Sequence, residues 1–97
     1  MKAKEYAEKY RSGLLAPSGS EEGKKALYGL LRDLCNEVVD LCERRGGKQG
    51  RPNPGAFKGA WKEVNAKWKS IAYNNPEFCL NPNGFESWCE MKGMLPK

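Results

Sequence analysis

Basic side chains are the residues of this sequence best suited to chemistry, and that chemistry is the binding of phosphate groups. Lys58, Lys62 and Lys69 fall on a narrow arc of a helical wheel, with Asn65 completing the row and no acid among them. Lysines in such a row neutralise the phosphates of a nucleic-acid backbone. The row also flanks an apolar stripe, so a structural role, in which the lysine stems cover hydrophobic surface, is the alternative.

More cations lie just before this row in the sequence. Residues 44–69 hold eight Lys and Arg against one acid, whereas residues 1–43 hold seven against eight acids. Two of these arginines would also suit a helix C-terminus, where positive charge meets the negative end of the dipole. With Tyr73, which lies near the row, the predicted nucleic-acid-binding residues are Arg44, Arg45, Lys48, Arg51, Lys58, Lys62, Lys69 and Tyr73.

Aromatic residues offer a second means of holding a nucleic acid or a protein, since rings stack on bases and anchor interfaces. Trp61 and Trp68 match the apolar stripe, so we expect them in the core. Tyr73 and the pair Tyr6 and Tyr10 are freer to contact a partner. No helix-turn-helix spacing, RNP-like aromatic pair or phosphate-binding glycine loop occurs, so we expect backbone binding rather than base reading.

Catalytic and metal-binding signatures are missing from the sequence. There is no histidine, which removes the commonest general base and metal ligand. Cys35 and Cys42 would lie about 10.5 Å apart along one helix, too far to share a zinc ion that holds each sulfur at roughly 2.3 Å. We therefore predict a non-enzymatic protein without metal or cofactor, in which the cysteines are buried thiols; a disulfide from this helix to Cys79 or Cys89 is the alternative.

Composition bounds the class of protein. The chain has 97 residues, 39% hydrophobic and 30% charged, with a formal net charge of +5. This length predicts a single helical domain over residues 1–97, and no apolar run approaches the roughly 18 residues of a membrane span. No apolar segment follows the basic N-terminus, so we expect a cytoplasmic protein without a secretory signal and without a membrane partner.

Two apolar stripes must position the basic residues. The stripes, which share a 4-3-4-3 spacing, are Leu27-Leu31-Leu34-Val38-Leu41 and Phe57-Trp61-Val64-Trp68-Ile71. This spacing is typical of helices that each bury one face. Helices over about 21–45 and 54–73, joined by the polar segment 46–51, predict an all-α fold built on an antiparallel helical hairpin.

The first of these helices has an apolar arc wider than a two-helix seam requires. It must therefore contact more than one neighbour, either the other helix and an N-terminal helix or a second copy of the chain. The remaining arc is expected to face water; it carries Asp33, Asn36, Glu37, Asp40 and Glu43.

Shorter elements are expected at both ends. Residues 3–14 predict a short helix. Ser18, three residues before Glu21, predicts a reciprocal cap at the start of the next helix. Near the C-terminus, Phe85, Trp88 and Cys89 share a helical face, which favours a short helix capped by Asn83. A β-hairpin about the turn at residues 81–84 is the alternative.

These features predict a small helical binding protein that engages a phosphate-rich partner, most simply DNA or RNA. The alternative is a protein-interaction or inhibitor module, by analogy with small viral or mobile-element accessory proteins, that acts through an apolar helical face. A further possibility is an oligomer that binds small anionic nucleotides.

Overall fold

In the computed structural model, residues 2–17, 19–44 and 54–93 are described, and every regular element within them is helical. The elements are α1 (Ala3–Leu14), α2 (Glu21–Arg44), α3 (Pro54–Asn74), the 3-10 helix η1 (Pro76–Phe78) and α4 (Gly84–Met91). The all-α prediction is confirmed.

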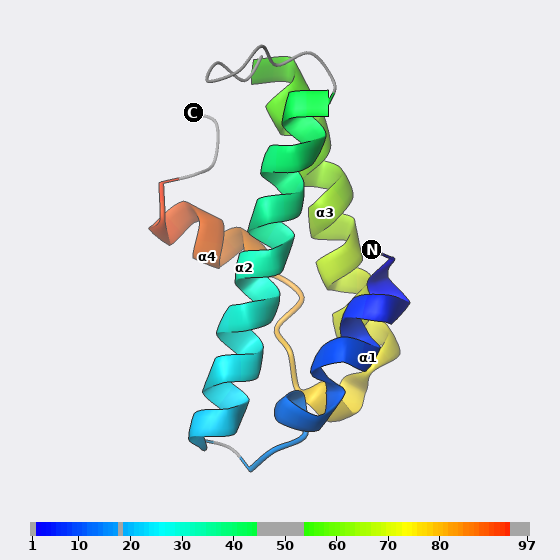
Figure 1. Cartoon of the computed structure of the whole chain (residues 1–97), viewed down its shortest axis with the longest axis vertical. Coiled ribbons are helices and arrows are strands. Elements are labelled where there is room, and N and C mark those ends of the chain that lie inside the picture. Colours follow the sequence, from blue (N-terminus) through cyan, green and yellow to red (C-terminus); the bar gives the residue numbers. More distant parts are fainter. Residues whose placement is uncertain (1, 18, 45–53, 94–97) are drawn as a thin grey trace.

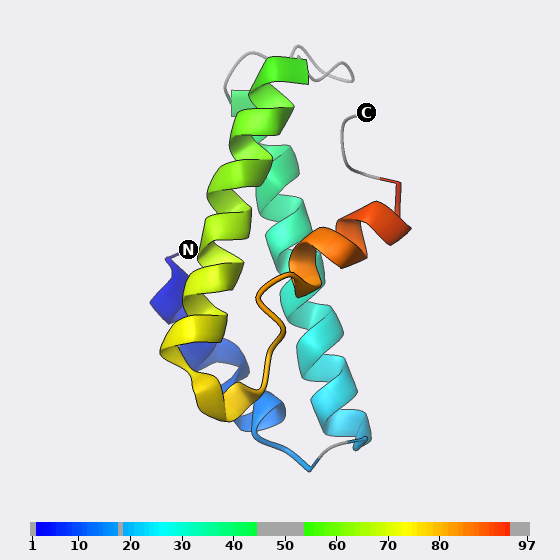
Figure 2. The same ribbon diagram turned by 180° about the vertical axis from the view of Figure 1, so that it is seen from behind.

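The two long helices organise the molecule. α2 and α3 lie side by side and run in opposite directions, and α1 packs across both (Figures 1 and 2). A chain segment from the end of α3 then leads to α4, which crosses α2 and points away from α3 (Figure 2). The segment that would join α2 to α3 lies outside the described residues, so the hairpin connection stays a prediction.

Local signals explain where the helices begin. The Ser20 hydroxyl accepts a hydrogen bond from the Gly23 backbone N–H at 3.1 Å, which caps the first turn of α2. α3 begins at Pro54, a residue that loses nothing at the first helical position because its missing N–H has no partner there.

The C-terminal element is the predicted helix, and the β-hairpin alternative is wrong because residues 84–91 are helical. The cap differs from our expectation, since the Asn83 side chain makes no capping hydrogen bond. Instead, the Asn81 side-chain oxygen accepts a hydrogen bond from the Asn83 backbone N–H at 2.9 Å and shapes the turn before α4.

The core fills the space between α1, α2 and α3. Leu30 and Leu34 of α2 and Val64 of α3 are fully buried. The wide apolar arc of α2 thus packs on both α3 and α1, which is the first of the two arrangements that the sequence allows. At the crossing of α1 and α2, a Cβ on Gly13 would lie 2.4 Å from the Ala26 Cβ, so this close approach requires glycine.

The first helix corrects one expectation. Tyr6 is only 4% exposed, and its ring belongs to the core. Tyr10 is partly buried and donates a hydrogen bond from its hydroxyl to Asp33 of α2. Neither tyrosine is free to stack on a partner, because α1 turns this face toward α2.

Trp68 connects α3 to the C-terminal part of the chain. Its ring is 2% exposed, and its indole N–H donates a hydrogen bond to the Asn81 carbonyl oxygen at 2.8 Å. A Cβ on Gly84, the first residue of α4, would lie 2.9 Å from the same ring. About two turns earlier on α3, the Trp61 ring stacks on Phe85 with centroids 6.3 Å apart. These contacts hold α4 beside the long helices.

A search of the described helices for a membrane span finds none long and apolar enough.

Candidate nucleic-acid interface

Three of the predicted lysines and Tyr73 lie along one side of α3. Successive positions on an α-helix differ by about 100°, so Lys58, Lys62, Lys69 and Tyr73 fall within an arc of roughly 60°. We call these four residues the basic row. The distance along the helix axis from Lys58 to Tyr73 is about 22 Å.

Packing of the opposite side of α3 turns the basic row outward. Val64, Trp68 and Ile71 are buried against the rest of the molecule. The centre of the basic row lies about 140° around the helix axis from that side. Lys58 and Lys62 are exposed, Lys69 is half-buried and Tyr73 is 69% exposed.

None of the three lysines in the basic row makes an ion pair within the described part of the chain. Their positive charge is therefore not neutralised by a described carboxylate. An uncompensated row of this kind attracts an anionic partner.

Asn65 does not complete the row. Its side chain is buried, at 8% exposure, and its Oδ1 atom has no hydrogen-bond partner among the described residues. Asn65 follows Trp61 by one turn, on the side of α3 where Trp61 stacks on Phe85. The expectation that it completes the row was wrong, because packing around α3 buries this position.

The remaining predicted site residues are not brought to the row by the described structure. Arg44 ends α2, is exposed, and lines a shallow cavity of about 280 Å³ that also contains Asp33, Glu37 and Asp40. Its surroundings are thus acidic. Arg45, Lys48 and Arg51 lie outside the described residues.

Two other cations near these helices are paired and have a structural role. Lys67 of α3 contacts Glu37 of α2 at 2.6 Å, and both side chains are largely buried. Arg11 of α1 lies 3.6 Å from Glu77 and over the Phe78 ring. Lys67 belongs to the same basic stretch of sequence as the row, yet it serves the interface between α2 and α3.

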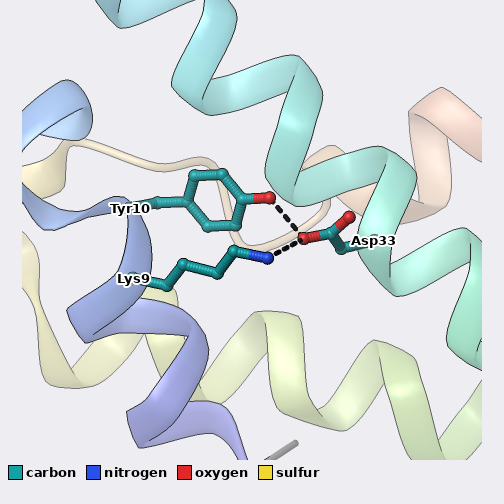
Figure 3. A network of polar contacts seen from close by, with 3 residues as sticks. All are labelled: Lys9, Tyr10 and Asp33. Atoms are coloured by element: carbon teal, nitrogen blue, oxygen red, sulfur yellow. Dashed lines mark hydrogen bonds and ion pairs between the residues drawn. The ribbon is translucent and has the colours of Figure 1, made fainter.

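The contact between α1 and α2 is a small polar network (Figure 3). One carboxylate oxygen of Asp33 accepts hydrogen bonds from the Tyr10 hydroxyl and from the Lys9 amino group, the latter at 3.1 Å. Burial opposes ionisation of Asp33, but these two donors and the charge of Lys9 lower its pKa overall. Asp33 and Glu37 therefore face neighbouring helices, which corrects the expectation that their arc of α2 faces water.

A second basic surface, which the sequence analysis did not identify, lies between α2 and α4. It combines Tyr28, Trp88 and Met91 with four cations, Lys24, Lys25, Arg32 and Lys92. We call it the α2–α4 face. The sequence does hold a signal for it, because Lys24, Tyr28 and Arg32 follow one another at four-residue spacing on α2. Charge summed over residues 1–43 conceals these cations, since the sum includes the acids of α2, of which only Glu21 lines this face.

The cysteines are placed largely as predicted. Cys35, Cys42 and Cys89 are buried, and none of the four cysteines forms a disulfide bond. Cys79 is exposed, which differs from the prediction. Burial raises the pKa of Cys35 to about 11, with a further contribution from Cys89. Such a thiol stays protonated and unreactive at neutral pH.

Metal ligands do not gather in the described ranges: no three Cys, Asp or Glu side chains there lie close enough together to hold an ion.

Comparison of the chain with known protein families, with curated proteins and with solved structures found no match.

Proposed function

We propose that this protein is a small, non-enzymatic, helical binding protein that engages the phosphate backbone of a nucleic acid through the basic row of α3. The observation that carries this proposal is the set of three lysines without ion pairs on one side of one helix. Lysines used for folding in this chain, such as Lys67, have carboxylate partners instead.

The spacing of the row suits a polyanion. Lys58 and Lys69 are separated by about 16 Å along the helix, and phosphates of one strand follow one another at roughly 3.4 Å along a duplex axis. The three amino groups would therefore contact a stretch of about five nucleotides. At the other end of the row, Tyr73 offers an exposed ring on which an unpaired base would stack.

The proposal includes the segment between α2 and α3. Its cations Arg45, Lys48 and Arg51 precede Lys58 in the sequence and would add positive charge for the same strand. Binding by charge alone reads no sequence, so we expect little discrimination between oligonucleotides of different base order. A cytoplasmic location, where free thiols persist, suits this function.

The test is a titration of labelled single- and double-stranded oligonucleotides at 50 and 200 mM salt, followed by fluorescence anisotropy. For three phosphate contacts, we expect the affinity of the unmodified protein to fall by a factor of about 20 to 40 between these concentrations. The variant Lys58→Glu/Lys62→Glu/Lys69→Glu should lose this salt-sensitive binding.

The matched control is Lys24→Glu/Lys25→Glu/Lys92→Glu, which removes the same charge from the α2–α4 face. It should retain binding, apart from the small loss that any change in net charge causes. Equal losses in both variants would show that only net charge matters, and the absence of salt-sensitive binding by the unmodified protein would refute the proposal.

A further inference from the structure

The α2–α4 face contains an apolar pocket beside exposed aromatic and thioether groups. Its volume is about 350 Å³, within the range of pockets that bind small groups. Leu27 and Leu31 of α2 line it, as do Trp88 and Met91 of α4. The Trp68 ring and Leu80 also line it.

Basic residues surround the neighbouring part of this face. A wide depression of about 910 Å³ shares Tyr28, Trp88 and Met91 with the pocket. The charged side chains that line it are Lys24, Lys25, Arg32 and Lys92, against the single acid Glu21. None of the four cations makes an ion pair within the described residues.

Large apolar side chains remain in water on this face. Tyr28 is 58% exposed and Met91 is 76% exposed, although both lie beside a pocket that would accept them or a partner's side chain. Lys92 places its amino group 5.7 Å from the centre of the Trp88 ring, so cation and aromatic group are already combined at the edge. An apolar patch with a polar rim is typical of interaction sites.

We propose that the α2–α4 face binds an acidic segment of a partner protein, which inserts one or two large apolar side chains into the pocket and pairs its carboxylates with the surrounding cations. An acidic partner is favoured by charge complementarity, since four cations and only one acid line the depression. The lining and size of the pocket favour a peptide: leucine and methionine side chains line it together with aromatic rings, and a volume of about 350 Å³ accommodates a Leu, Met or Phe side chain. Met91 is unbranched and adapts to such side chains.

This surface is separate from the basic row, because no residue of the row lines either hollow. The inference therefore does not depend on nucleic-acid binding.

The experiment is selection of displayed random 12-residue peptides on the full chain, followed by anisotropy measurements with the enriched peptides. We expect enriched sequences to hold one or two large apolar residues next to Asp or Glu. The variant Lys24→Glu/Lys25→Glu/Lys92→Glu should weaken binding by about tenfold or more. Tyr28→Ala/Met91→Ala should do the same, and it should leave the fold intact because both side chains are exposed.

The control is the row variant Lys58→Glu/Lys62→Glu/Lys69→Glu, which should bind the peptides within about twofold of the unmodified protein. Three results would overturn the inference: no acidic and apolar consensus, peptide binding that survives both α2–α4 variants, or oligonucleotide binding that only the α2–α4 charge variant abolishes. The last result would assign this face to nucleic acid and would refute the role proposed for the row.

Discussion

The junction of α1, α2 and α3 and the outer side of α3 use the same residue type in opposite ways. At the junction, Lys67 pairs with Glu37 and Lys9 pairs with Asp33. On the outer side, Lys62 and its neighbours in the row have no such partners among the described residues. Lys62 and Lys67 are five positions apart on one helix, so the difference comes from what lies opposite each. A lysine is available to a ligand only where no neighbouring helix presents an acid.

Among the variants that test this difference between buried and outer sides of α3, replacement of Trp68 should have the largest effect on stability. Trp68 and Lys69 are adjacent, so burial of the ring fixes the direction in which Lys69 points. We expect Trp68→Ala to destabilise the protein by about 3 to 5 kcal/mol, because it leaves a cavity and removes the hydrogen bond to the Asn81 carbonyl. Trp68→Phe should cost less, since it keeps most of the buried area. Thermal melting followed by circular dichroism measures both, and an unchanged melt for the alanine variant would show that α3 does not bury this side.

A matched pair of lysine variants compares the two regions directly. Lys67→Met should destabilise by about 1 to 3 kcal/mol, because it leaves the partly buried Glu37 carboxylate without this cation. Lys62→Met should change the stability by less than about 0.5 kcal/mol, as is usual for exposed sites. Chemical denaturation of each variant gives these values. Similar costs for both would contradict the distinction between structural and available lysines.

The smallest expected effect concerns the dependence of stability on pH. The pKa of Asp33 is lowered in the folded protein, so its ionised carboxylate stabilises the fold at pH values above its unfolded pKa, near 3.9. This stabilisation is lost as the pH falls through the pKa that Asp33 has in the folded protein. Asp33→Asn should thus be less stable by about 1 kcal/mol at neutral pH. The difference from the unmodified protein should shrink as the pH is lowered from about 5 to 2.

The exposed Asp40 on the same helix supplies the control for this pH experiment. The Asp40→Asn variant should be as stable as the unmodified protein at each pH of the acid range. The reason is that Asp40 is exposed and makes no ion pair with a described residue. If the difference in stability between Asp33→Asn and the unmodified protein were the same at every pH, the charge of Asp33 would not be the source of its stabilising effect.

The sequence by itself determined the helices and the line of residues along each one. Apolar spacing located α2 and α3, and Pro54 marked the start of α3, because these signals are local and the helix period fixes which residues share a side. For the same reason, the basic row could be found from the sequence, since all its members lie on one helix.

Only the tertiary structure decided what each side of a helix meets. Tyr6 and Asn65 lie at the edges of apolar stripes, where the position of a neighbouring helix determines burial. Asp33 and Glu37 looked solvent-exposed because their partners, Lys9 and Lys67, come from helices distant in sequence. The α2–α4 face depends on where Trp68 and Asn81 hold the last helix. Contacts between residues far apart in the chain set these positions, and residue spacing within one helix carries no information about them.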